Sequence, residues 1–178
     1  MTILIAYATI EGQTGKIARF LHDRLTGLGH DVRLVDVGDR LATVPFDGVD
    51  QVILAAPVHE RRHPKNFEVF LSGSVLALAQ RRCMLLSVSL SAAFEEGHAE
   101  AQDYVAEMLM RTGLEPDAVA LVAGAVRIGR YDYYATQVLR HVVMRGRAYD
   151  VAEGDHAFTD WDALEADVMR FLEETEAA

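Results

Sequence analysis

The chain has few cysteines, no long apolar run and no basic segment at its start, features that disulfide-bonded, membrane-spanning and secreted proteins depend on. Its single cysteine, Cys83, allows no internal disulfide and no cysteine-based metal site, and we expect it to be a small core residue. No apolar run reaches the roughly 18–20 residues of a membrane span. No basic segment precedes the first apolar run, as it would in a secretory signal peptide. We therefore expect a cytoplasmic protein.

Other chemistries are also missing from the sequence. The seven histidines show no spacing typical of metal ligands, so we expect no metal site. No G-x-S-x-G sequence surrounds a serine, which argues against a hydrolase of that type. The net charge of −10 makes nucleic acid an unfavourable partner. We find no residue that the sequence marks as a catalytic acid, base or nucleophile.

Apolar segments of two kinds alternate along the chain. Short, nearly continuous apolar runs predict buried strands, and longer segments with helical spacing predict helices between them. With 178 residues, the chain fits one domain, residues 1–178. The alternation predicts an α/β fold with a doubly wound parallel sheet. The predicted strands are 3–8, 31–37, 52–56, 83–89 and 118–123, and the predicted helices are 15–28, 66–79, 95–111 and 161–174.

The segment between the first strand and the first helix has the composition of a phosphate-binding loop. It contains Thr9, Ile10, Glu11, Gly12, Gln13 and Thr14. The unpaired N–H groups at a helix start, together with the helix dipole, favour an anion there. The loop lacks both the G-K-S/T ending of nucleotide triphosphate loops and the G-x-G-x-x-G pattern. An ordinary strand–turn–helix with capping threonines is the alternative.

The pattern of Tyr7, Thr9, Gly12 and Thr14 resembles that of the flavodoxins. The resemblance implies the strand order 2-1-3-4-5 and a bound FMN whose phosphate is held by Thr9, Ile10, Glu11, Gly12, Gln13 and Thr14 without a nearby cation. Two departures are Glu11, where flavodoxins usually have threonine, and the flanking Ala6 and Arg19, where they have bulkier apolar residues. Glu11 must turn its carboxylate away from the phosphate.

Two further loops should lie beside the first, at the carboxyl ends of the third and fourth strands. In a flavin-binding interpretation, Pro57, Val58 and His59 and then Ser87, Val88 and Ser89 bracket the isoalloxazine ring. A charged surface loop at 57–64 and a plain strand end at 87–93 are the alternatives.

A long insertion, about residues 125–157, separates the fifth strand from the last helix. Residues 127–147 hold five arginines against one acid, Asp132. Such a segment suits carboxylates on a flat substrate, an anionic membrane surface, or a covering helix with solvated arginines. A loop of this length inside a domain is usually functional.

The sequences 123–131 and 158–161, together with Glu11-Gly12-Gln13-Thr14, resemble the menaquinone-dependent protoporphyrinogen oxidases, which are flavodoxin-like enzymes. The resemblance implies an FMN-dependent oxidoreductase of haem biosynthesis that oxidises protoporphyrinogen IX to protoporphyrin IX with a quinone as acceptor. It implies substrate binding by Arg127, Arg130 and Tyr131, and peripheral contact with the cytoplasmic membrane. A flavodoxin-type electron carrier and an FMN-dependent NAD(P)H quinone reductase are the alternative functions.

Overall fold

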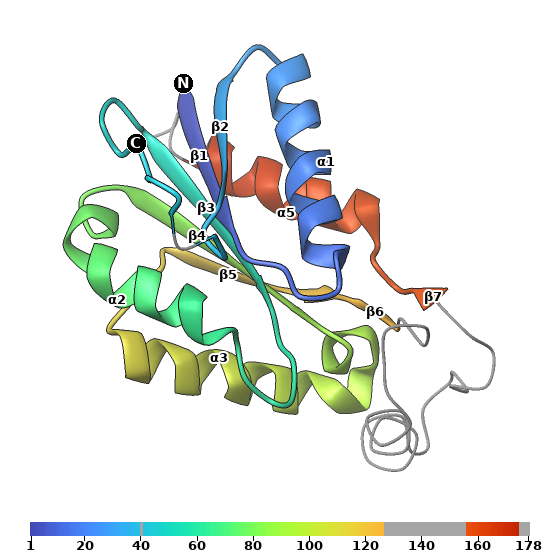
Figure 1. Cartoon of the computed structure of the whole chain (residues 1–178). Coiled ribbons are helices and arrows are strands. Elements are labelled where there is room, and N and C mark those ends of the chain that lie inside the picture. Colours follow the sequence, from blue (N-terminus) through green and yellow to red (C-terminus); the bar gives the residue numbers. More distant parts are fainter. Residues whose placement is uncertain (40, 127–155, 175–178) are drawn as a thin grey trace.

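A five-stranded parallel sheet organises the computed structural model, which describes residues 1–39, 41–126 and 156–174. The strand order is β2-β1-β3-β4-β5, as the resemblance to flavodoxins implied. Each crossover between neighbouring strands carries a helix, so that the sheet is doubly wound (Figure 1). The strands are β1 (Thr2–Tyr7), β2 (Asp31–Asp36), β3 (Gln51–Pro57), β4 (Arg82–Ser89) and β5 (Ala118–Ala123).

Helices cover both faces of the sheet. On one face lie α1 (Gln13–Gly27) and α5 (Trp161–Glu173), and on the other lie α2 (Lys65–Leu78) and α3 (His98–Thr112) (Figure 1). All nine predicted elements are present, with ends that differ from the prediction by at most three residues. The α/β fold class predicted from the sequence is therefore confirmed.

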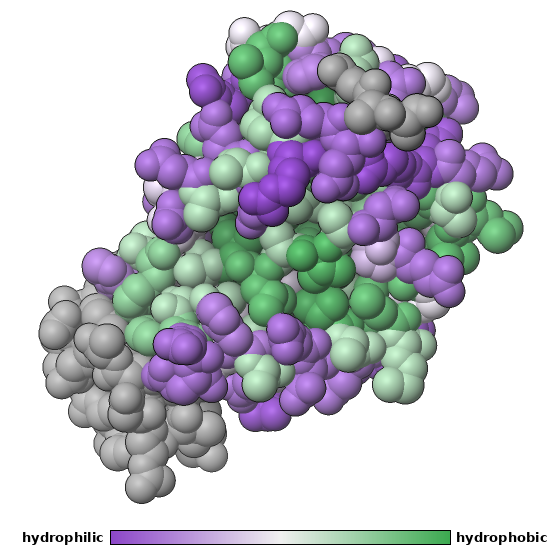
Figure 2. Space-filling view, turned by 180° about the vertical axis from the view of Figure 1, so that it is seen from behind, coloured by the Kyte–Doolittle hydropathy of each residue, from purple (hydrophilic) through white to green (hydrophobic). Residues whose placement is uncertain are grey.

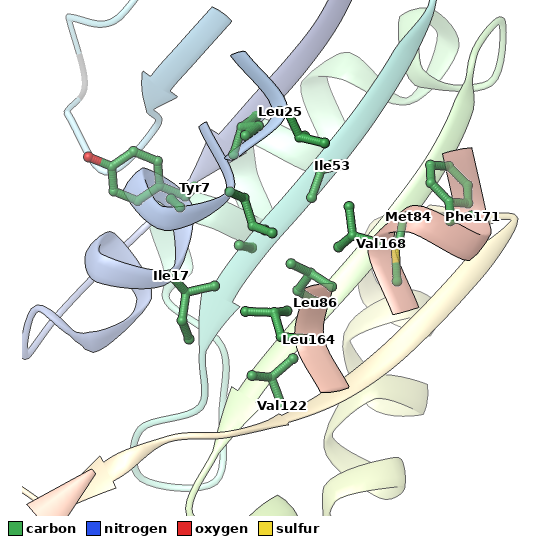
Figure 3. Close-up of a cluster of buried hydrophobic side chains, with 14 of the residues drawn as sticks. Tyr7, Ile17, Leu25, Ile53, Met84, Leu86, Val122, Leu164, Val168 and Phe171 are labelled. Atoms are coloured by element: carbon green, nitrogen blue, oxygen red, sulfur yellow. The ribbon is translucent and has the colours of Figure 1, made fainter. Parts of the chain in front are cut away.

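The central strand β1 shows why the predicted strands are continuous apolar runs. Successive side chains of a strand point to opposite faces, and both faces of this sheet are covered. Ile3 and Ile5 therefore join the core beneath α1 and α5, whereas Leu4 and Ala6 join the core beneath α2 and α3. Figure 3 shows the first of these cores, where Ile17 of α1 and Leu164 of α5 converge on the sheet.

Glycine and aspartate mark the helix ends in the expected way. Gly29, with φ of 91°, follows α1, and Gly113, with φ of 73°, follows α3. Two residues before α5, Thr159 and Asp160, have side chains of the kind that cap helices. The structure assigns that role to Asp160, whose side chain accepts a hydrogen bond of 3.0 Å from the Ala163 N–H.

The predicted helix over 95–111 was wrong in its first turn. Residues Glu95–Gly97 form a separate 3-10 turn, and α3 begins at His98. Gly97 lies so close to the preceding loop that a β-carbon there would fall 2.2 Å from the Ser91 carbonyl oxygen. The backbone bends at this point because the chain must pack against Ser91.

The sheet ends on one side in an apolar edge. Every residue of β5 is alanine, valine or leucine, and Val119 is 44% exposed. Seen from behind, the molecule carries a band of hydrophobic residues across its middle, below a hydrophilic upper part (Figure 2). No helix of the described ranges is both long and apolar enough to span a bilayer.

A short strand pair that the sequence did not predict joins the two ends of the insertion. The strands β6 (Ala125–Val126) and β7 (His156–Ala157) are antiparallel, and the Phe158 N–H donates to the Gly124 carbonyl at 3.0 Å. The insertion therefore leaves and re-enters the domain at one place. The predicted substrate residues Arg127, Arg130 and Tyr131 lie outside the described residues.

Candidate functional site

Three loops meet at the carboxyl edge of the sheet. They follow β1, β3 and β4, which are neighbours in the order of the sheet and run parallel. The edge therefore brings together the three segments that we predicted around a ligand, residues 9–14, 57–59 and 87–89. This is also the point where successive crossovers change direction, which is where ligands bind in such folds.

The first loop leaves the start of α1 open. Gly12 has φ of 94°, a left-handed conformation that favours glycine, and a β-carbon there would meet nothing within 4 Å. The Gly12 N–H donates to Thr9 Oγ1 at 3.0 Å. No side chain among the described residues caps α1, and its first turn contains no acid. The N–H groups of that turn are thus available to an anion.

The hydroxyl of Thr14 is buried and lacks a partner. Thr14 is 1% exposed, and its Oγ1 makes no hydrogen bond to any described residue. Such groups are uncommon in native proteins because an unpaired buried polar atom costs free energy. Ile10, at the tip of the loop, is 47% exposed although it is apolar. Both observations agree with a loop that is completed by a ligand.

Gln13 turns its side chain away from the loop. Its Nε2 donates to Thr159 Oγ1 at 2.9 Å, and Thr159 Oγ1 in turn donates to the Ala123 carbonyl at 2.6 Å. This buried chain of hydrogen bonds joins the start of α1 to the end of β5 and the start of α5. A contact of Gln13 with a phosphate, as predicted, would therefore use its backbone N–H and not its side-chain amide.

The second loop is a tight hairpin in a strained conformation. His59 and Arg62 exchange both backbone hydrogen bonds, at 2.9 and 3.1 Å. Between them, Glu60 and Arg61 have φ of 49° and 66°. Two consecutive left-handed residues are usual for Asn-Gly turns, but a glutamate or an arginine costs about 1–2 kcal/mol in this conformation. Contacts outside the hairpin must maintain it.

Side-chain contacts hold this hairpin from both sides. His59 Nε2 lies 3.6 Å from Glu11 Oε1 of the first loop. Arg61 Nη1 lies 2.8 Å from Glu100 Oε1 of α3, and its guanidinium stands over the Tyr104 ring. Glu100 also accepts a hydrogen bond from the Ser91 hydroxyl. The carboxylate of Glu11 is thus directed to the neighbouring loop, as a phosphate-binding loop requires.

Beneath the hairpin, His63 is buried against β4. It is 1% exposed, and its Nε2 lies 2.9 Å from Ser87 Oγ. Burial lowers the pKa of His63 to about 4, an effect that nearby Glu68 opposes and Arg111 reinforces. Glu68 itself lies between Arg62 and Arg111, at 2.6 and 2.7 Å. Hydrogen bonds from both arginines lower the pKa of Glu68 despite the opposing effect of its burial.

The third loop begins at the buried end of β4, where Ser87, Val88 and Ser89 still belong to the strand. These three residues are at most 4% exposed. Ser89 Oγ accepts a hydrogen bond from the Ala92 N–H at 3.1 Å, and the Ser89 carbonyl accepts one from the Gly124 N–H. The hydroxyls of this loop are therefore already engaged in the structure. Its predicted role beside the ring stays a prediction.

Pro57 and Val58 lie between the first and third loops. They are partly exposed, and the Val58 N–H donates to the Val88 carbonyl at 2.7 Å. Sequence reasoning missed that Glu100 connects the second loop to Ser91 and that Thr159 connects Gln13 to the end of β5. An acid one turn into a helix and a threonine before a helix carry no distinctive signal.

Within the described ranges, no group of three or more His, Cys, Asp and Glu side chains is arranged to hold a metal ion.

Solved structures similar to this chain include flavodoxins. Flavodoxin 1 from Bacillus cereus is 17% identical, with a TM-score of 0.47 over 69% of this chain and 84% of that chain. A flavodoxin from Fusobacterium nucleatum, solved with bound flavin mononucleotide, is 18% identical, with a TM-score of 0.46 over 74% of each chain.

The sequence itself has curated relatives and matches a family. The Escherichia coli (strain K12) protoporphyrinogen IX dehydrogenase [quinone] is 26% identical over 165 residues, which are 92% of this chain and 91% of that protein. The protein of the same name from Escherichia coli O157:H7 matches equally. Residues 4–151 match the family model described as Flavodoxin domain. The chain therefore belongs to the flavodoxin domain family.

Proposed function

We propose that the protein is an FMN-dependent oxidoreductase that oxidises protoporphyrinogen IX to protoporphyrin IX and passes the electrons to a quinone. The observation that carries the proposal is the open start of α1, with Gly12 left-handed and the Thr14 hydroxyl buried without a partner among residues 1–39, 41–126 and 156–174. The substrate is proposed from the near end-to-end similarity to the Escherichia coli dehydrogenase of that name.

The residues at the carboxyl edge fit FMN. A phosphate monoester needs several N–H donors, a hydroxyl, and backbone that it can approach closely. Residues 9–14 offer the N–H groups of the first turn of α1, Thr14 Oγ1, and open space at Gly12. The buried strand end Ser87–Ser89 and a hairpin with cationic side chains then flank the space where a flat ring would lie.

Each loop has a separate part in this function. Residues 9–14 would bind the phosphate, mainly through backbone N–H groups. Pro57, Val58 and His59, together with Ser87–Ser89, would orient the ring and exclude water from one of its edges. Bound FMN would supply the redox chemistry, which the protein residues do not perform themselves. Cationic side chains in the hairpin would favour an anionic reduced cofactor and raise its reduction potential.

The substrate would meet the protein at the insertion. Protoporphyrinogen carries two propionates, which arginines bind in a bidentate manner, and a flat macrocycle, which aromatic rings contact. We propose Arg127 and Arg130 for the propionates and Tyr131 for the macrocycle. The β6–β7 pair supports this placement, because it anchors both ends of the insertion beside Gly124, whose N–H bonds to the third loop. We further propose a cytoplasmic protein in which the basic insertion makes peripheral contact with the membrane that holds the quinone.

The test is oxidation of protoporphyrinogen by purified, FMN-loaded protein with menadione as acceptor. The control is the same mixture without protein, because the substrate oxidises slowly in air. We expect porphyrin fluorescence to grow at a rate that requires both FMN and the quinone. FMN binding without turnover would contradict the oxidase and favour an electron carrier, for which the acidic net charge of −10 speaks. Turnover of a quinone with NAD(P)H would instead favour a quinone reductase.

A further inference from the structure

Arg19 of α1 extends back over the first turn of its own helix. A β-carbon at Gly15 would lie 3.4 and 3.5 Å from the two terminal nitrogens of the Arg19 guanidinium, and 3.6 Å from Thr9 Cγ2. Residues four apart are neighbours on a helix surface, and helical side chains point toward the N-terminus. The guanidinium therefore lies beside Gly15 and close to the phosphate loop.

The absence of a side chain at Gly15 makes this position accessible. Any larger residue there would cover the surface on which the guanidinium lies, since the nearest atoms to its β-carbon are those of Arg19. Gly15 is buried and helical, a setting in which glycine costs about 0.5–1 kcal/mol relative to alanine. The sequence accepts this cost next to a ligand-binding loop.

Electrostatics makes an unpaired cation unfavourable at this place. The N-terminal end of a helix carries a partial positive charge, which repels cations by about 0.3–1 kcal/mol. The first turn of α1 holds no acidic residue, and no hydrogen bond or ion pair joins the exposed Arg19 side chain to any residue that the structure describes. Glu11, the acid of the loop, is directed to His59 at 3.6 Å. A bound anion would resolve this repulsion.

We propose that Arg19 is a phosphate-binding residue that pairs with the dianionic phosphate of FMN and offsets the negative charge of Glu11. The inference rests on the proposed FMN site and extends it, since the resemblance to flavodoxins implies a phosphate bound without a nearby cation. Arginine binds phosphate oxygens in a bidentate manner and remains charged at every physiological pH. The pairing makes the site selective for a phosphorylated flavin.

The test compares FMN with riboflavin, which has the same ring and no phosphate. Arg19→Gln keeps most of the side-chain length and removes the charge. From the strength of charge-assisted hydrogen bonds, we expect FMN to bind about tenfold more weakly to this variant and riboflavin to bind within about twofold of the wild type. Arg19→Lys should lose less affinity for FMN than Arg19→Gln, because it keeps the charge but not the bidentate geometry.

Two further variants separate the proposed contact from general charge effects. Arg24→Gln makes the same change on the same helix, at a residue paired with Glu165 and away from the loop, and it should leave FMN affinity unchanged. Glu11→Gln should tighten FMN binding severalfold by removing a carboxylate near the phosphate. Dissociation constants come from quenching of flavin fluorescence at about 0.15 M salt, where distant charges are screened.

The outcomes distinguish this inference from the proposed function. Equal loss of FMN and riboflavin in Arg19→Gln, or an unchanged FMN affinity, would overturn the role of Arg19 while leaving the flavin site in place. A folded wild-type protein that binds neither flavin would overturn both proposals. A loss confined to FMN, with Arg24→Gln unaffected, would establish the contact.

Discussion

The two loops on either side of the proposed ligand achieve left-handed backbone in opposite ways. The loop of residues 9–14 uses glycine at its left-handed position, Gly12, where a β-carbon would meet no atom within 4 Å. The hairpin of residues 59–62 places Glu60 and Arg61 in that conformation and is held by side-chain contacts to Glu11 and Glu100. The first conformation is encoded locally, whereas the second depends on tertiary contacts.

This difference indicates which of the two loops can keep its conformation when its surroundings change. A loop whose conformation is intrinsic can leave its hydrogen-bonding groups unpaired until a ligand arrives. A hairpin that depends on its neighbours changes when they change, so its side chains respond to the charge of the loops beside it. We therefore expect the loop of residues 9–14 to bind the ligand without changing its backbone, and the hairpin of residues 59–62 to change conformation when the charge of its neighbours changes.

The largest expected effect concerns the unpaired hydroxyl of the first loop. Replacing Thr14 with valine keeps the shape of the side chain and removes Oγ1, which is buried without a partner among the described residues. We expect FMN to bind more weakly by about 1–3 kcal/mol, because a phosphate oxygen loses a donor. Titration calorimetry of wild type and variant provides the measurement. Unchanged affinity would show that the phosphate lies elsewhere.

The buried histidine beneath the hairpin should make stability depend on pH. In the folded protein burial lowers the pKa of His63 from its ordinary value of 6.5 to about 4, so between these pH values the unfolded chain binds a proton that the folded protein excludes. The resulting stability is complete above pH 6.5 and is lost progressively as the pH falls toward 4. At pH 5 the loss attributable to His63 is about 2 kcal/mol.

The variant His63→Gln isolates this contribution, since glutamine does not titrate. Urea unfolding at pH 7.5 and pH 5 should show a smaller loss of stability in the variant than in the wild type. The carboxylate of Glu68, whose pKa is also lowered, remains in both proteins and contributes equally to each. If wild type and variant lose the same stability between pH 7.5 and pH 5, the pKa of His63 is not lowered in the folded protein.

Substitution at Gly12 tests the local half of the comparison. Gly12→Ala should lower the free energy of unfolding by about 1–2 kcal/mol through backbone strain alone, because no atom obstructs a β-carbon there. Gly73 of α2 is the matched control: it also faces open space but has helical backbone. Gly73→Ala should raise stability by about 0.5–1 kcal/mol. Two changes of the same sign would show that Gly12 does not need its left-handed conformation.

The smallest effect concerns the strained hairpin. Glu60→Asn should stabilise the protein by about 0.5–1 kcal/mol, because asparagine tolerates φ of 49° better than glutamate. Glu96→Asn, in the exposed 3-10 turn, makes the same chemical change without positive φ and should have no stabilising effect. Thermal unfolding at one pH suffices to compare them. A destabilised Glu60→Asn would imply that the glutamate makes a contact that offsets its strain.

The contrast between the loops also explains what the sequence could predict. Strands such as β1 are continuous apolar runs, and the phosphate loop has threonines and a glycine at fixed spacing, so that both are visible locally. The hairpin was not predicted as a hairpin, since Glu60-Arg61 carries none of the usual turn residues. The 3-10 turn before α3 depends on the approach of Gly97 to Ser91. The β6–β7 pair joins residues about thirty positions apart and is too short to show a pattern.

Titration of the purified apoprotein with FMN and, separately, with riboflavin is the most direct test of the phosphate site. We expect one FMN bound per chain, with quenched flavin fluorescence, and weaker binding of riboflavin because the loop of residues 9–14 recognises the phosphate. Absence of FMN binding by folded protein, or equal affinity for the two flavins, would contradict this expectation.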